Sequence, residues 1–157
     1  MKIQRRSWDC GPICIINALK AIGVNVTEKQ VHAYSGTTKK DGTNQFGILS
    51  ALAGLNVPAK EYFLDPEEEN NRIFNDFLQE NLMAGHPIII DFYNGAHWVA
   101  LVGTIGDRVI VWDSDFSKKN KKENGSYALT EEQLFKRWKP DTKGLYYLIL
   151  VNYDDKT

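Results

Sequence analysis

The sequence of 157 residues contains only two cysteines and no long run of apolar residues. Its longest apolar stretches, such as residues 87–90 and 148–151, are much shorter than the roughly 20 residues that span a bilayer. The N-terminus also lacks the apolar segment of a secretory signal peptide. We therefore expect a cytoplasmic protein, in which a reducing environment disfavours a disulfide between Cys10 and Cys14. Because tetrahedral zinc takes four ligands, two thiols alone make a poor metal site, and we predict no metal or cofactor.

An excess of charge of either sign is missing as well. The 19 Lys and Arg residues balance 20 Asp and Glu residues, which removes the electrostatic argument for binding nucleic acid or an anionic membrane. The one basic run, residues 118–122, lies among polar residues and is interpreted as a solvated loop. With 43% apolar and 25% charged residues, no repeat and no linker, residues 1–157 are predicted to form a single globular domain.

The first half of the sequence has helical patterns. Apolar residues at steps of three predict a helix over residues 10–22, with Asp9 as its N-cap. Two more helices are predicted over residues 27–34 and 44–53, the first of them opened by a capping box. A short strand over residues 59–64 and a long helix over residues 65–83 are predicted to follow.

The second half changes to strand patterns, rich in Ile, Val, Tyr and Trp. The predicted strands cover residues 87–93, 97–103, 108–113 and 145–152, and a last helix covers residues 130–138. The order of elements predicts an α+β fold, with an N-terminal helical half packed on a C-terminal antiparallel meander.

Cys10 lies at the start of the first predicted helix, where free backbone N–H groups and the helix dipole favour an anion, and hence a thiolate. A nucleophile and a buried structural cysteine are both open interpretations of this segment. Gly11 is expected to leave room beside the sulfur for a substrate backbone. Cys14, one turn further into an apolar helix, is predicted to belong to the core.

A nucleophilic cysteine needs a base, and His97 is the strongest of the three histidines. It opens an apolar strand directly after Gly95 and Ala96, small residues that leave the imidazole open to a cleft. Asp113 ends the strand that is predicted to pair with the His97 strand, so its carboxylate can orient the imidazole. Asp115 is a second carboxylate two residues further on.

These residues resemble a known family. The stretch from Gln4 to Pro12, in which the cysteine of Asp-Cys-Gly lies six positions after the glutamine, is similar to the opening of C39 and C39-like papain-fold cysteine peptidases. The segment from Ala96 to Leu101, with an aspartate 16 positions after His97, resembles the histidine strand and acidic residue of that family. The resemblance spans the chain and implies a papain-like fold.

The resemblance also implies the roles of four residues: Cys10 as nucleophile, His97 as general base and acid, Asp113 as its orienting group, and Gln4 as oxyanion donor. Two departures from the family pattern limit how far the resemblance can be carried. Family members usually have proline after the aspartate, where this chain has Ser114, and the chain has no nucleotide-binding P-loop motif. Specificity for a Gly-Gly leader therefore does not transfer by resemblance alone.

The sequence favours a thiol hydrolase that cuts a peptide or isopeptide bond through an acyl-enzyme intermediate, and glycine is the residue expected before the cut bond. Acyl transfer on the same residues and a non-catalytic peptide-binding module are the alternatives. A peptide or protein is the expected partner, and the oligomeric state stays open. Trp8 and Trp98 neighbour the proposed catalytic residues and are expected, with Gly11, Gly95 and Ala96, to line the substrate cleft.

Overall fold

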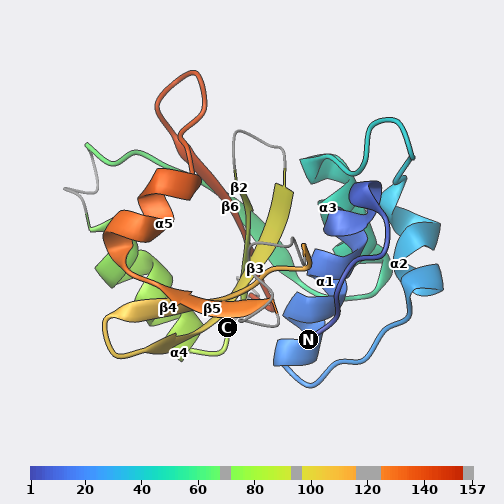
Figure 1. The fold of residues 1–157 in the computed structure, drawn as a ribbon, viewed down its shortest axis with the longest axis horizontal. Helices are drawn as coiled ribbons and strands as arrows, with labels where there is room; N and C mark the ends of the chain where they lie inside the picture. Colours follow the sequence, from blue (N-terminus) through green and yellow to red (C-terminus); the bar gives the residue numbers. More distant parts are fainter. Residues whose placement is uncertain (68–71, 93–96, 116–124, 154–157) are drawn as a thin grey trace.

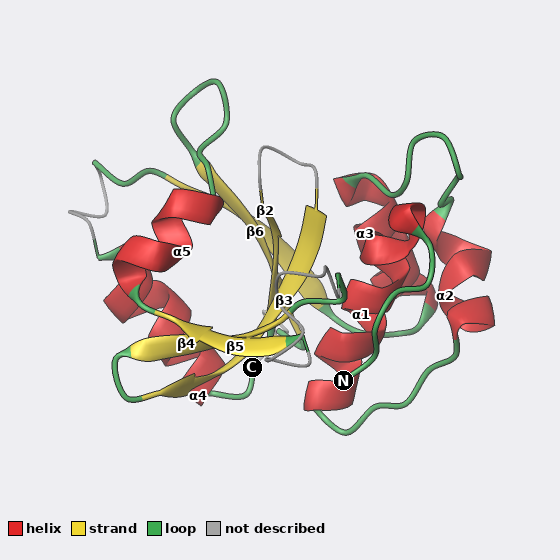
Figure 2. Ribbon diagram, in the orientation of Figure 1, coloured by secondary structure: helices red, strands yellow, loops and turns green. Residues whose placement is uncertain are grey.

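A six-stranded antiparallel sheet separates two groups of helices in the computed structural model, which describes residues 1–67, 72–92, 97–115 and 125–153. Three helices, α1 to α3, cover one side of the sheet, and α4 and α5 lie on the other (Figure 1). The colouring by secondary structure shows that the first of these groups contains no strand (Figure 2). The predicted α+β class is confirmed.

The helical half consists of α1 (Cys10–Ala21), α2 (Glu28–Ser35) and α3 (Gln45–Gly54). Helix α1 is buried at every position from Cys10 to Leu19, because it lies between the sheet and the other two helices. The capping box predicted for α2 is present: the Thr27 side chain accepts a hydrogen bond from the backbone of Gln30, and the Gln30 side chain accepts one from the backbone of Thr27.

The order of strands in the sheet is β1-β6-β2-β3-β4-β5. Their bounds are Ala59–Leu64 (β1), Ile88–Phe92 (β2), His97–Ile105 (β3), Arg108–Trp112 (β4), Ser126–Leu129 (β5) and Tyr146–Val151 (β6). Strands β2 to β5 form the predicted meander, in which each strand pairs with the next one along the chain. Strand β6 instead lies between β1 and β2, an arrangement that a simple meander does not have. Strand β5 was not predicted, because its four residues carry too short a pattern to be recognised.

Both faces of the sheet are buried. Ile88 and Ile90 pack with the residues under α4 and α5, while Ile89 packs on the other face against α1. A strand that is covered on both sides has no solvent-facing positions, so its sequence is a continuous apolar run rather than an alternating one. The three consecutive isoleucines that begin β2 have this cause.

The prediction of a long helix over residues 65–83 is wrong for the first residues of that range. The Asp65 carboxylate accepts a hydrogen bond from the backbone of Glu67, which forms a turn instead of a first helical turn. A π-helical segment, η2 (Ile73–Gln79), then leads into the short helix α4 (Glu80–Met83).

The last predicted helix is present as α5 (Glu131–Arg137), with a capping box between Thr130 and Gln133. Across the described ranges, none of the helices combines the length and the apolar character that crossing a bilayer requires.

Candidate active site

Cys10 is the first residue of α1 and follows a single 3-10 turn, η1 (Ser7–Asp9). Its side chain is almost fully buried, with the residue 8% exposed. The prediction that Asp9 caps α1 is wrong, because no side-chain capping bond forms. The buried Asp9 carboxylate instead binds the Arg6 guanidinium, 2.5 Å from Nε to Oδ2, and lies 3.4 Å from Nε2 of His32. Asp9 therefore fixes the turn before the nucleophile candidate to α2 and to Arg6.

His97, at the start of β3, contacts both other members of the predicted triad. Its Nε2 lies 2.5 Å from Oδ1 of Asp113, and its ring also hydrogen-bonds the Cys10 side chain. Since Nε2 is used by Asp113, Nδ1 is the nitrogen left for the sulfur. Burial opposes a charged imidazole, but the hydrogen bonds with Asp113 and Cys10 outweigh it and raise the pKa of His97 to about 10. The imidazole is therefore protonated near neutral pH.

Asp113, one residue beyond β4, is held by several donors besides His97. The Tyr127 hydroxyl donates to Oδ2 over 2.7 Å, and the backbone N–H of Asp115 donates to Oδ1 over 2.9 Å. Burial raises the pKa of Asp113, but the bonds from His97, Tyr127 and the Asp115 backbone outweigh it and lower this pKa below its ordinary value. Of the two carboxylates in this segment, Asp113 contacts the imidazole, while Asp115 is exposed and contributes its backbone.

Tyr127 was not found from the sequence. It lies on β5, the strand whose pattern is too short to recognise, and it comes 14 positions after Asp113. A tyrosine in a strand is usually a packing residue, so only the pairing of β4 with β5 reveals that its hydroxyl reaches the carboxylate.

Gln4 belongs to the N-terminal segment, which runs alongside α1 (Figure 1). Lys2 ties this segment to the middle of α1: its backbone N–H donates to the Asn17 side chain over 2.6 Å, and its carbonyl accepts from the Asn17 amide over 3.0 Å. The backbone N–H of Gln4 donates to the carbonyl of Ser114 over 2.9 Å. The Gln4 amide Nε2 donates to the Arg6 carbonyl over 3.1 Å.

A small cleft of about 220 Å³ opens beside Cys10. Its lining consists of Ser7, Trp8, Cys10, Lys39, Lys40, Asp41, Gly42, Thr43 and Trp98. The Trp98 indole N–H donates to the Thr43 carbonyl over 2.7 Å, so β3 holds the loop between α2 and α3 in place. Trp8 and Trp98 thus both line this cleft beside the cysteine, and their contact with a substrate stays a prediction. Gly95 and Ala96 lie outside the described residues.

Gly11 was predicted to leave room for a substrate backbone, but in the structure it lies against the Thr43 side chain. A Cβ on Gly11 would lie 2.6 Å from the Thr43 side chain, far closer than packed atoms allow. The space beside its Cα is therefore filled by the protein's own loop, and Gly11 allows α1 to pack against Thr43. Contact between Gly11 and a substrate backbone stays a prediction.

Cys14 belongs to the core, as predicted. It is 1% exposed, and burial in apolar surroundings raises the pKa of its thiol well above the ordinary value. Both cysteines are free. Among the described residues, no cluster of three or more His, Cys, Asp or Glu side chains could hold a metal ion.

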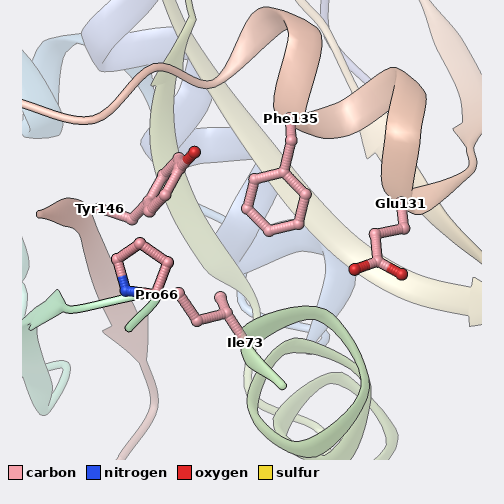
Figure 3. Close-up of a pocket in the computed structure, with 5 residues that line it drawn as sticks. All are labelled: Pro66, Ile73, Glu131, Phe135 and Tyr146. Carbon is pink, nitrogen blue, oxygen red and sulfur yellow. The ribbon is translucent and has the colours of Figure 1, made fainter. Parts of the chain in front are cut away.

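A larger pocket of about 280 Å³ lies apart from Cys10, beneath α5 (Figure 3). Its lining residues are Pro66, Ile73, Glu131, Phe135 and Tyr146, none of which lines the cleft at Cys10. Cys10 lines the smaller cleft, and none of the proposed catalytic residues lines the larger pocket, so volume alone does not identify the candidate site.

The chain belongs to the Peptidase_C39 like family, whose model matches residues 3–145. Its fold is similar to the peptidase domain of Streptococcus ComA, a bifunctional ABC transporter involved in quorum sensing, with a TM-score of 0.68 and 21% identity over 96% of this chain and 95% of that one. It is also similar to a double glycine motif protease from an AMS/PCAT transporter in complex with the leader peptide. That match has a TM-score of 0.66 and 21% identity, and it covers 95% of this chain and 87% of that one.

A putative C39-like peptidase from Bacillus anthracis matches with a TM-score of 0.59 and 15% identity, over 99% of this chain and 96% of that one. A sequence relative, an uncharacterized protein from Methanothermobacter thermautotrophicus, is 31% identical over 74 residues. That match covers 46% of this chain and about half, 51%, of the curated relative. The predicted papain-like C39 fold is thereby confirmed, and the family supports a cysteine peptidase-like hydrolase.

Proposed function

We propose that the protein is a thiol hydrolase that cleaves a peptide or isopeptide bond with Cys10 as its nucleophile. The observation that carries the proposal is the position of the His97 imidazole, which contacts both the Cys10 side chain and the buried carboxylate of Asp113. This arrangement supplies a nucleophile, a proton carrier and an orienting anion in the order that acyl transfer needs.

In the first half of the reaction, the Cys10 sulfur attacks the scissile carbonyl carbon, and the carbonyl oxygen takes the negative charge. The backbone N–H of Cys10 and the Gln4 amide are the proposed donors to this oxyanion. When the tetrahedral intermediate collapses, the C–N bond breaks and His97 gives its proton to the leaving amine. A thioester remains on Cys10.

In the second half, water attacks the thioester carbon while His97 accepts a proton from it. Collapse of the second tetrahedral intermediate breaks the C–S bond, releases a carboxylic acid and restores the enzyme. The pKa of about 10 at His97 favours the protonated ring in the free enzyme, which suits the donation of a proton to the first leaving group.

The proposed substrate is an extended peptide with a small residue, such as glycine, before the cut bond. The cleft beside Cys10, which Trp8 and Trp98 help to line, is the proposed subsite for this residue. The structural relative that is a double glycine motif protease acts on peptides of this kind, and its fold match adds weight.

A fluorogenic peptide series ending in Gly-Gly, Ala-Ala or bulky pairs tests the proposal through kcat/KM. Peptides with Gly-Gly should be cleaved at least about tenfold better than bulky ones, the scale of a few methylene groups in a pocket. Cys10→Ala should be inactive. Activity that persists in Cys10→Ala, or a preference for bulky residues, contradicts the proposal, and a product joined to an added amine instead of water indicates acyl transfer.

A further inference from the structure

Ser114 holds Gln4 at two points. Its carbonyl accepts from the Gln4 backbone N–H over 2.9 Å, and its hydroxyl donates to Oε1 of the Gln4 side chain over 2.6 Å. Ser114 is 1% exposed, and its hydroxyl is directed at the Gln4 side chain. These two bonds join residues that are 110 positions apart in the sequence.

The second bond matters because the two ends of an amide are not equivalent. Only the NH₂ end of Gln4 can donate to an oxyanion, while the oxygen end would repel it. The Arg6 carbonyl, which can only accept, binds Nε2 and so selects the orientation in which Oε1 faces Ser114. The Ser114 hydroxyl then satisfies Oε1, and the second hydrogen on Nε2 stays available for a ligand.

The hydroxyl also affects the strength of the donor. A hydrogen bond accepted at the oxygen of an amide polarises it and makes its N–H groups stronger donors. Asp113 and Ser114 are neighbours in the chain, so the same short segment after β4 orients the imidazole of His97 and the amide of Gln4.

We propose that Ser114 is a positioning residue for the oxyanion donor, acting through the Gln4 side chain. The inference rests on the proposed function, because it presumes that Gln4 donates to the oxyanion. It also gives a role to a departure from the family pattern, since the proline that the resemblance predicts at this position has no hydroxyl.

The test is a double-mutant cycle of Gln4→Ala and Ser114→Ala, measured as kcat and KM on the best glycine-ending peptide. Ser114→Ala keeps the backbone bond to Gln4 and removes only the hydroxyl. We expect it to lower kcat about tenfold, the scale of one ordinary hydrogen bond, with KM nearly unchanged. In the Gln4→Ala background, Ser114→Ala should not lower kcat any further, because the side chain that Ser114 positions is already absent. Ser126→Ala, an exposed serine on the adjacent strand β5, serves as the matched control.

A second readout needs no turnover. A peptide aldehyde ending in glycinal adds to the Cys10 thiol, which forms a C–S bond and leaves the former carbonyl oxygen in the oxyanion position. Its affinity, followed by tryptophan fluorescence, should fall in Ser114→Ala by the same factor as kcat.

Equal losses from Ser114→Ala in the wild-type and Gln4→Ala backgrounds overturn the inference, as does an unchanged kcat in a folded variant. A wild-type protein that neither cleaves the peptide nor binds the aldehyde overturns the proposed function itself, so the two failures are distinguishable.

Discussion

The two cysteines differ at the level of single residues in ways that predict their chemistry. Cys10 starts α1, contacts His97 and lines an open cleft, whereas Cys14 is fully enclosed in the helix interior and burial raises the pKa of its thiol. Brief treatment with iodoacetamide near neutral pH should therefore label Cys10 first, as peptide mapping would show. Preferential label on Cys14 would contradict the assignment of the nucleophile.

The two carboxylates after β4 differ as well. Asp113→Asn keeps the shape of the side chain but favours the wrong imidazole tautomer, so we expect turnover to fall by roughly 10²–10⁴-fold in a protein that still folds. Asp115→Asn should have a mild effect, because Asp115 binds Asp113 through its backbone. Steady-state kinetics of both variants give the answer, and the reverse ranking would move the orienting role to Asp115.

The raised pKa of His97 predicts how stability depends on pH. A histidine whose folded pKa lies above its ordinary 6.5 stabilises the protein fully below pH 6.5, and this contribution is lost as pH rises towards the folded value of about 10. Since the Cys10 side chain also contributes to the raised pKa of His97, the measurement belongs in Cys10→Ala, where Asp113 alone still raises that pKa.

Urea unfolding of Cys10→Ala between pH 6.5 and 10 should show a loss of up to about 1.4 kcal/mol per pH unit in the free energy of unfolding. Cys10→Ala with Asp113→Asn, in which the imidazole loses its anionic partner, should show a clearly smaller slope, because the other titrating groups are common to both proteins. Equal slopes in the two proteins would mean that His97 is not protonated by its contact with Asp113.

At the scale of elements, the loop between α2 and α3 sets the charge of the cleft. The charged residues that it places at the cleft are Lys39, Lys40 and Asp41, so positive charge is in excess, and the Lys39 ammonium lies 5.5 Å from the centre of the Trp8 ring. We expect peptides with an acidic residue within about three positions of the cut bond to be cleaved several-fold better at low salt than neutral ones. The cleavage rates of a peptide series in which one glutamate is moved from position to position measure this preference. The double variant Lys39→Gln with Lys40→Gln serves as the comparison. An unchanged ranking in the variant would exclude the two lysines as its cause.

The elements show what the sequence could and could not predict. Helix α2 and the helix α5 were predicted because their capping boxes are local signals, carried by residues three positions apart. The insertion of β6 between β1 and β2 depends on long-range pairing, for which no local pattern exists. The turn at Asp65 was missed because an aspartate before proline suits both a helix start and a turn.

At the scale of the whole molecule, the candidate site joins four segments: residues near Gln4, the start of α1, the start of β3 and the end of β4. Resemblance to a family suggested four candidate residues for the site, but the residues that hold these four in place could not be predicted. Tyr127 and Ser114 act through hydrogen bonds to Asp113 and Gln4 that exist only once the N-terminal segment and β5 pack beside β4.

The central claim is that Cys10 forms a covalent acyl intermediate that His97 helps to resolve. Intact-protein mass spectrometry of a rapidly quenched reaction with a glycine-ending peptide tests it most directly. The account predicts an adduct with the mass of the acyl group on Cys10 that accumulates in the wild type, decays to free enzyme with release of the acid, and is absent from Cys10→Ala. An adduct on another residue, or cleavage of the peptide by Cys10→Ala, would contradict it.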